Sequence, residues 1–535
     1  MRNGIPNISP EERTSLVQLL LDIVQAQHDE IARLRDEIAI LKGQKPRPKI
    51  EPSRLEQPAK DKPVADEGQK QQRPGSDKRS KNAELKITHE VTVRVPDPPA
   101  GSVRKDFEEF IVQELVLETK VTRYLRERIV TPAGRTLVAP LPAEVVPGSH
   151  YGPLLIGFVL YQYHHNHVTQ PLLLEQLGEL GIDISSGQLS RILTEKKDVF
   201  HREKEELLPA GLASASFIHV DDTGARHQGK NGYCTHIGND FFAYFASTDS
   251  KSRLNFLNVL RGSCTEVTLN EVAAAYWERQ ELPVTLIAAL GDGRQHFADA
   301  AAWQARLQEL GITGDRHVRI ATEGALLGSL IAHGVSPHLV VLSDGAWQFN
   351  ILVHAACWIH AERPLARMIP SSDEHRATIE KMRGEIWRLY QDLKAYRQQP
   401  DPERKPALQA RFDALVEQRT GFPSINGVLK DMRQHRADLL CVLDRPEVPL
   451  HNNNSESDIR DYVKKRKISG STRSEDGRRC RDTFASLKKT CRKLGVRFWQ
   501  YLQDRIRGLG QVPRLADLLR QNATEGQSSA ATIVP

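Results

Sequence analysis

The first part of the chain carries apolar residues at every third or fourth position, a pattern typical of a coiled-coil helix. Ser9 and Pro10 suit the N-cap and first turn of a helix spanning residues 1–43. Apolar residues and one glutamine occupy alternating a and d positions: Val17, Leu20, Val24, Gln27, Ile31, Leu34, Ile38 and Leu41. A short helix packed on its own domain is the alternative, but the next segment offers no core. We therefore expect a parallel coiled coil that forms a homodimer.

The pattern changes twice before the next helical region. Residues 44–84 are rich in Pro, Lys, Gln and Asp and have little to bury, so we expect a disordered linker. Residues 85–150 then alternate apolar and polar positions between Pro and Gly turns. This alternation predicts a small β module.

Residues 151–200 return to helical spacing and form a candidate DNA-binding region. Two short apolar stretches are separated by Gly181, and Ser185 or Ser186 can cap the second one. Such a pair fits a helix-turn-helix, whose second helix would present Gln188, Arg191 and Lys196 to DNA. An ordinary helical hairpin fits the same pattern equally well.

Two apolar strands further along the chain end in acidic residues. The first, residues 217–220, runs into Asp221 and Asp222 and is followed by a β-hairpin turning near residues 239–240. The second, residues 339–342, runs through a serine into Asp344. An acid at the end of a core strand is unfavourable unless it faces a solvated cleft or a cation.

Charged helical sequence separates the second strand from a C-terminal motif. Residues 371–440 contain Pro400 and Pro402 at a break and predict a helical insertion. The motif that follows reads LHNNNSESDIRDYVKKRKISGSTR, residues 450–473. Its asparagines can cap a helix with Glu456 in the first turn and cations at the far end, as the helix dipole favours. A capped surface helix explains this stretch alone.

Composition limits the class of protein. A chain of 535 residues is too long for one core, so we expect three or four domains. It has no run of eighteen apolar residues and no secretion-signal pattern, so we expect neither a membrane span nor export. Its six cysteines show no metal-knuckle spacing, which indicates a reducing cytoplasm and no disulfide framework.

Positive charge is concentrated in one segment. Between Lys464 and Arg497 the chain has 13 Lys or Arg against 3 Asp or Glu, a local net of +10 in a chain of net +6. Such a segment usually binds a polyanion, although a solvated face is the alternative. The residues expected to contact DNA here are Lys464, Lys465, Arg466, Lys467, Arg473, Arg478, Arg479 and Arg481.

The three acids Asp221, Asp344 and Glu456 could converge. Three carboxylates suit Mg²⁺, which prefers oxygen ligands and acts on phosphates. The order of strand and acid, hairpin, strand and acid, then helix and acid is that of the ribonuclease-H-like α/β fold.

Four ordered motifs strengthen this interpretation. The chain resembles the insertion sequence 66 family of DDE transposases through DDT, SDG, CWIH and NNNSE followed by KKRKISGS, at residues 221–223, 343–345, 357–360 and 452–456. The resemblance covers roughly residues 140–505 and implies a ribonuclease-H-like domain at 212–370 and 441–510, with 511–535 as a tail. It also implies that Asp221, Asp344 and Glu456 are catalytic acids binding two Mg²⁺ ions, for which Mn²⁺ can substitute.

The chain lacks one feature of this family, and two other aspartates are alternative candidates for the catalytic acids. The family usually has two CxxC pairs at the zinc-ribbon-like position, residues 85–150, but no cysteine precedes Cys234 here. Asp292 also follows an apolar stretch, expected to be a strand, and rivals Asp344. Asp222 is an alternative to Asp221 as the first catalytic acid, but it matches the glutamate of the family's DET motif, which is not a metal ligand.

The CWIH stretch and the asparagine run offer supporting residues. His354, Cys357 and His360 could be half of a zinc site, but no second half is visible. We expect Cys357 in the core, and His360 and Asn453 beside the catalytic acids.

The resemblance implies a bacterial transposase that binds terminal inverted repeats and cleaves and transfers DNA strands. A catalytically inactive or domesticated DNA-binding relative is one alternative, and a metal-dependent nuclease without strand transfer is another. Expected partners are terminal and target DNA, a second copy and accessory proteins of the element. The expected location is the cytoplasm, in association with the nucleoid and not with a membrane.

Overall fold

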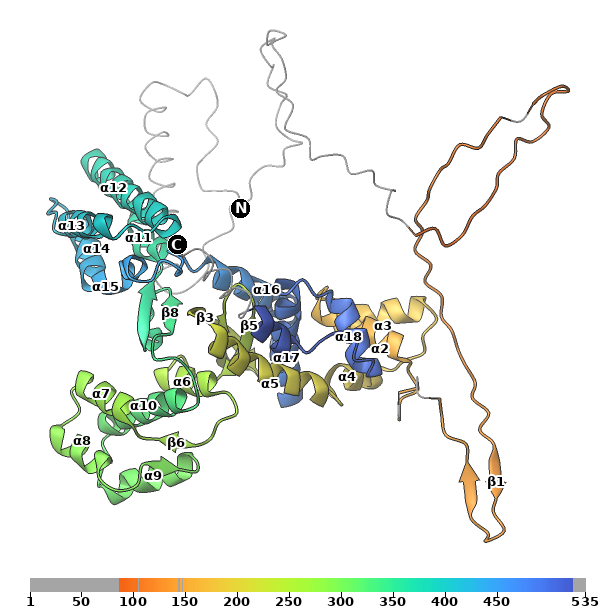
Figure 1. The fold of residues 1–535 in the computed structure, drawn as a ribbon, viewed down its shortest axis with the longest axis horizontal. Helices are drawn as coiled ribbons and strands as arrows, with labels where there is room; N and C mark the ends of the chain where they lie inside the picture. The colour runs from red at the N-terminus through yellow and green to blue at the C-terminus, as the bar shows by residue number, and fades with distance from the viewer. Residues whose placement is uncertain (1–85, 104, 143–144, 147, 523–535) are drawn as a thin grey trace, which may run out of the picture. The chain divides into compact units, whose positions relative to one another are not determined.

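The computed structural model describes residues 86–103, 105–142, 145–146 and 148–522 (Figure 1). The expected coiled coil (1–43) and linker (44–84) lie outside these residues. The chain divides into two units, Met1–Glu114 and Leu115–Pro535. The described part of the first unit contains neither helix nor strand.

The second unit begins with extended chain and one short antiparallel strand pair, β1 (Arg128–Val130) and β2 (Thr136–Val138). All six strand residues are exposed. Within the described residues, this pair is all the regular β structure at the position of the expected β module.

Four helices follow: α2 (Pro153–His164), α3 (Gln170–Glu179), α4 (Ser186–Thr194) and α5 (Asp198–Ser214). The expected helix pair is α3 and α4, and the chain turns between them at Gly181, whose φ of +74° favours glycine. Leu173 and Leu177 of α3 and Leu189 of α4 are fully buried, so the pair packs into the main core.

The centre of the unit is a mixed five-stranded sheet in the order β5-β4-β3-β8-β9. Its strands are β3 (Phe217–His227), β4 (Lys230–Gly238), β5 (Ala243–Thr248), β8 (Val340–Ser343) and β9 (Val353–Ala356). β4 runs antiparallel to β3 and β5, whereas β8 is parallel to β3 and β9. This order and these directions fit the ribonuclease-H-like fold.

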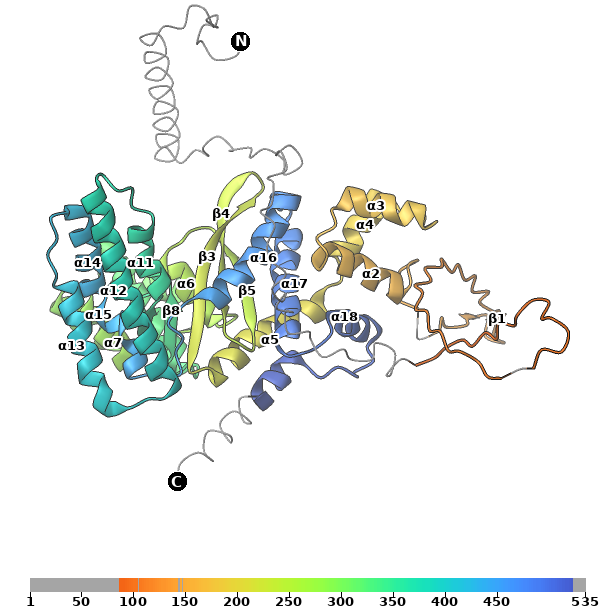
Figure 2. The same ribbon diagram turned by 90° about the horizontal axis from the view of Figure 1, so that it is seen from above.

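Two C-terminal helices cover the antiparallel half of the sheet, as Figure 2 shows. α16 (Asn453–Ser469) packs on β3 and β4, and α17 (Glu475–Lys493) packs on β5. Every second backbone N–H of edge strand β5 donates to a side chain of α17, namely to Asp482, Ser486 and Thr490. These bonds close an edge that would otherwise present unpaired groups. α18 (Phe498–Arg507) then packs against α2.

Helices are inserted at two places in the sheet sequence (Figure 1). Between β5 and β8 lie α6 (Arg253–Arg261), β6 (Val267–Thr268), α7 (Glu271–Arg279), α8 (Val284–Gly291), β7 (His296–Phe297), α9 (Ala300–Glu309) and α10 (Asp315–Ala332). Between β9 and α16 lie α11 (Trp358–Ala366), α12 (Asp373–Gln398), α13 (Lys405–Val416), α14 (Pro423–Gln434) and α15 (Arg436–Leu439).

The second insertion has a hydrophobic core of its own, built around Trp358, Leu393 and Phe412. It occupies the region expected to be a helical insertion, and its break near Pro402 is a short 3-10 turn. The first insertion was expected only as extra sequence containing a strand before Asp292. That expectation was wrong, because residues 284–291 form helix α8.

Candidate active site

The pairing of β3 with β8 aligns the first two acids. Phe217 pairs with Val340, Ile218 with Val341 and His219 with Leu342. Continuing this parallel register by two residues sets Asp221 opposite Asp344. The two acids therefore lie side by side at the carboxyl end of β8. The first strand is longer than expected, because β3 continues past Asp221 to His227, whereas Asp344 directly follows β8.

A tight turn fixes the chain around Asp344. The backbone N–H of Ala346 donates to Oδ1 of Asp344, and that of Gly345 donates to Oγ of Ser343, both at 3.0 Å. Gly345 has a φ of +93°, which a side chain would strain. The carboxylate of Asp344 is exposed at the end of a fully buried strand.

Asp221 lies within β3 and is partly buried. Burial and the negative charge of Asp344 raise the pKa of Asp221 to about 7. The charges of Asp222 and Glu456 act in the same direction, whereas the hydrogen bond from the Asp222 N–H opposes the shift. Each acid thus disfavours the ionised form of its neighbour. A cation at this position would relieve that repulsion.

Asp222 has a different environment from Asp221. Its Oδ1 accepts a hydrogen bond from Thr235 at 2.5 Å, and its Oδ2 accepts one from Gln348 at 3.1 Å. Both carboxylate oxygens are therefore occupied by neighbouring side chains. The geometry therefore favours Asp221 over Asp222 as the carboxylate that could bind a metal ion.

Glu456 lies in the first turn of α16 and faces α11. Its Oε1 is 3.1 Å from Nη2 of Arg363 and 3.5 Å from Nε2 of His360. Burial and the charge of Arg363 lower the pKa of His360. His360 thus lies beside Glu456, as expected, whereas nothing in the sequence pattern pointed to Arg363.

No group of three or more His, Cys, Asp or Glu side chains in the described part of the chain is close enough to hold a metal ion. The three acids therefore influence one another electrostatically without forming a closed cage of ligands. In this arrangement Glu456 is paired with Arg363.

Asn452 has a role that the sequence did not reveal. It was expected to cap α16, but it makes no side-chain cap bond. Its Oδ1 lies 2.8 Å from Nδ1 of His219, and its Nδ2 donates to the carbonyl of Val220 at 2.8 Å. Asn452 is buried and ties the start of the Glu456 helix to β3, next to Asp221. Asn453, by contrast, is exposed.

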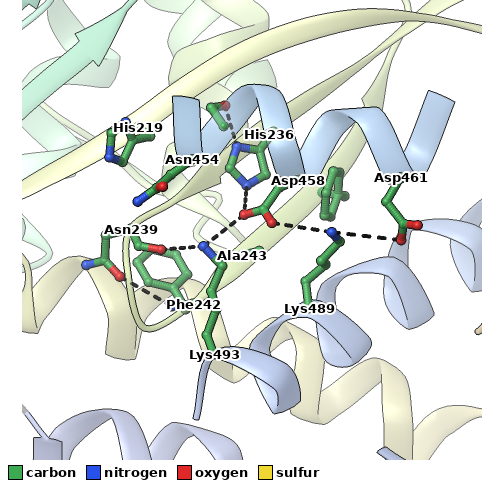
Figure 3. A network of polar contacts seen from close by, with 12 residues as sticks. His219, His236, Asn239, Phe242, Ala243, Asn454, Asp458, Asp461, Lys489 and Lys493 are labelled. Carbon is green, nitrogen blue, oxygen red and sulfur yellow. Dashed lines mark hydrogen bonds and ion pairs between the residues drawn. The ribbon is translucent and has the colours of Figure 1, made fainter. Parts of the chain in front are cut away.

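The opposite face of α16 is fixed by buried ion pairs, which Figure 3 shows. Asp458 lies 2.8 Å from Lys493, 3.5 Å from Lys489 and 3.3 Å from His236. Asp461 lies 2.6 Å from Lys488. Burial alone would raise the pKa of Asp458, but the bond to His236 and the charge of Lys493 hold it well below the usual range.

These contacts correct the expectation that the whole basic run is available to DNA. The Nζ of Lys465 lies 3.4 Å from the ring centroid of Tyr163 and donates to the Tyr163 carbonyl. Burial, with the charges of Arg481 and Lys488, lowers the pKa of Lys465 to about 7. Arg481 is also buried and donates to the carbonyl of Gly470. Lys465 of α16 and Arg481 of α17 are therefore engaged within the protein and are not free to bind DNA.

The remaining predicted cations lie nearer the surface. Lys464, Lys467 and Arg473 are exposed. Arg466 donates to Thr223 at 3.3 Å, Arg478 pairs with Glu475, and Arg479 pairs with Glu205. Arg460, which the sequence reasoning did not single out, is exposed one helical turn before Lys464 and shares its face of α16.

The three residues expected to read DNA from α4 differ in position. Arg191 is exposed on the helix. Gln188 is part of the capping box, where its Oε1 accepts from the N–H of Ser185 at 2.9 Å. Lys196 lies beyond the end of α4. Only Arg191 therefore matches the expected outward placement on this helix.

The remaining candidate residues are His354, Cys357 and Asp292. His354 is buried between Ser343, at 2.9 Å, and Asp438, at 3.2 Å. Cys357 is also buried, as expected for a core residue. Asp292 is exposed at the end of helix α8, and its carbonyl accepts from Arg306.

The sequence also matches a known protein family and a known relative. The family described as "Transposase IS66 family" matches residues 340–479, a stretch that contains Asp344, His360 and Glu456. "Uncharacterized protein y4jO" of Sinorhizobium fredii (strain NBRC 101917 / NGR234) is 41% identical over 321 residues, which are 59% of this chain and 100% of that protein. The chain belongs to the IS66 transposase family.

Membership agrees with the family expected from the four ordered motifs. This IS66-family chain carries two of its three candidate acids inside the matched stretch, whereas Asp221 precedes it. Among the described residues, no helix has the length and apolar character needed to cross a bilayer.

Proposed function

We propose that the protein is an active DDE transposase that binds the terminal inverted repeats of its element, cleaves DNA there and transfers the strands to target DNA. The observation that carries this proposal is the strand register that sets Asp221 opposite Asp344. The charge of Glu456, which reaches Asp221 from α16, supports it. A protein that only binds DNA has no need of three mutually repelling acids.

The donor set fits Mg²⁺, which one or two carboxylates commonly hold together with waters and substrate phosphates. Asp221 and Asp344 supply such a pair. Burial and the neighbouring acids raise the pKa of Asp221, and a divalent ion would favour its ionised form. Two Mg²⁺ ions, or Mn²⁺ in their place, would activate the attacking water or hydroxyl and stabilise the leaving oxygen.

Glu456 can join the proposed metal site only if its ion pair with Arg363 breaks. The pair is about one-third exposed on each side, at 32% and 31%, so its exchange with solvent or ligand is inexpensive. Arg363, once released, lies where a phosphate of the bound strand can replace the carboxylate of Glu456. Asn452, through its bonds to β3, would keep the start of α16 in place during this exchange.

The DNA backbone would lie along the outer face of α16, where Arg460, Lys464 and Lys467 are exposed. Arg191 of α4 is the residue best placed to contact bases from the helix pair. Residues 1–43 would join two copies so that two element ends are held together, with accessory proteins as further partners. The cytoplasm, at the nucleoid, is where such a protein meets its DNA.

An inactive, domesticated DNA-binding protein is the second candidate. The observation that favours it is the pairing of Glu456 with Arg363, which gives the third acid a cation of the protein itself as its partner. Purified protein incubated with the DNA that flanks its gene, with and without Mg²⁺, separates the two. The proposal expects nicks that map to the element ends only with the metal, whereas binding without any nick supports the inactive relative.

A further inference from the structure

An exposed tryptophan stands beside the candidate acids. Trp347 follows Asp344 by three residues, in the short 3-10 turn η2 (Trp347–Phe349), and 55% of its surface is exposed. Large aromatic side chains are usually mostly buried. Among described residues 148–522, Phe241 is the only other aromatic residue with comparable exposure, at 47%.

The inner side of this turn is held by a buried arginine. The guanidinium of Arg253 lies 5.2 Å from the centre of the Trp347 ring, and its Nη2 donates to the Trp347 carbonyl at 2.5 Å. Arg253 is only 7% exposed and donates to Tyr276 at 2.8 Å, while Glu323 lies 3.8 Å away. The indole therefore rests on a fixed cation instead of projecting from a loose loop.

The two neighbouring residues fix the same turn to the active site. Gln348 donates to Asp222 at 3.1 Å, and the buried ring of Phe349 packs edge-on against Phe256 with 4.9 Å between ring centres. Trp347 thus lies in the chain between Ala346, whose N–H donates to Asp344, and Gln348, which donates to Asp222. With 55% of its surface exposed, part of the indole is open to a ligand.

We propose that Trp347 is a stacking platform for an unpaired nucleobase of the strand whose backbone lies at Asp221 and Asp344. This inference rests on the proposed function. Every base has a flat aromatic face, so stacking on an indole is tolerant of sequence. A base inside a duplex can reach the indole only by leaving its stack, and enzymes that act on DNA use such displaced bases.

Fluorescence of the full-length protein can test this inference without cleavage, with EDTA present. The probe is a short oligothymidine, compared with a blunt duplex. We expect Trp347→Ala to weaken oligothymidine binding roughly ten-fold, within the range known for loss of one stacked base. Trp347→Phe should keep most of the affinity and lose the quenching of tryptophan emission. Phe241→Ala, which removes the other comparably exposed aromatic ring of residues 148–522, should change neither property.

Four results would overturn the inference. They are wild-type affinity in Trp347→Ala, unchanged quenching in Trp347→Phe, no binding of oligothymidine by the wild type, and a change of oligomeric state in Trp347→Ala, which would assign the indole to a protein contact. Melting curves of both Trp347 variants should match the wild type. The proposed function is judged separately by nicking at element ends, so each idea can fail while the other stands.

Discussion

At the scale of single residues, the candidate site combines acids that repel one another with side chains that fix their surroundings: burial and the charge of Asp344 raise the pKa of Asp221, and Arg363 pairs with Glu456. Asp221 and Asp344 follow apolar strands, and that pattern is local, so both could be predicted. The contacts of Asn452 with β3 and of Arg363 with Glu456 join residues far apart in sequence. Such partners are set by how the helices pack, so they could not be predicted.

The raised pKa of Asp221 gives a pH-dependent prediction. With a pKa of about 7 in the folded state against 3.8 for the free group, the folded protein binds more protons than the unfolded chain between about pH 4 and about pH 7. Stability therefore falls as the pH rises through this window. In EDTA at about pH 8, the free energy of unfolding of Asp221→Asn should exceed that of the wild type by on the order of 1 kcal/mol, and thermal unfolding should show a higher midpoint. At about pH 4 the two proteins should differ little. A difference that does not depend on pH would contradict this assignment.

At the scale of elements, α16 divides its charges between two faces. Asp458, Asp461 and Lys465 point into the unit and are partnered there, whereas Arg460 and Lys464 face outward. The count of cations along the sequence could predict a basic segment but not this division. The apolar run before Asp292 misled in a similar way, because a short apolar run suits either a strand or a helix and only tertiary packing decides.

The buried ion pairs of α16 should be important for stability. Asp458→Ala leaves Lys493 and Lys489 buried near a missing partner, and removing one member of a buried pair typically destabilises by about 3–5 kcal/mol. Asp476→Ala is the matched control, because Asp476 is an exposed acid in the first turn of α17 and should contribute less than about 1 kcal/mol. Urea unfolding of both variants gives the comparison. Equal losses would show that the network does not anchor α16.

The exposed face of α16 should set the salt dependence of DNA binding. Lys464→Gln and Lys467→Gln should each lower the slope of log affinity against log salt by about one, without changing sequence preference. Lys488→Gln removes an equal charge that is already paired with Asp461, so it should leave the slope nearly unchanged. Titrations at several salt concentrations measure this, and a reduced slope in the Lys488 variant would contradict the division of faces.

At the scale of the whole molecule, the α/β sheet with a helical insertion before Glu456 could be predicted because strand–acid motifs and a charged helical stretch are local signals. The folded insertion between β5 and β8 was missed because its helices α7 and α9 are short and separated by glycine turns. The N-terminal heptads lie outside the described residues, so the dimer they imply stays a prediction. Deleting residues 1–45 should convert a dimer into a monomer in light scattering. An unchanged mass would assign self-association to another surface.

The most direct test of the account is cleavage of element-end DNA by a panel of single variants. Asp221→Ala, Asp344→Ala and Glu456→Ala should each abolish Mg²⁺-dependent cleavage while binding the terminal DNA nearly as well as the wild type, and Mn²⁺ should rescue none of them. Asp222→Ala and Asp292→Ala should keep at least part of the activity, because Asp222 is occupied by Thr235 and Gln348 and Asp292 caps an outlying helix. An inactive Asp292→Ala beside an active Asp344→Ala would contradict the assignment of the site.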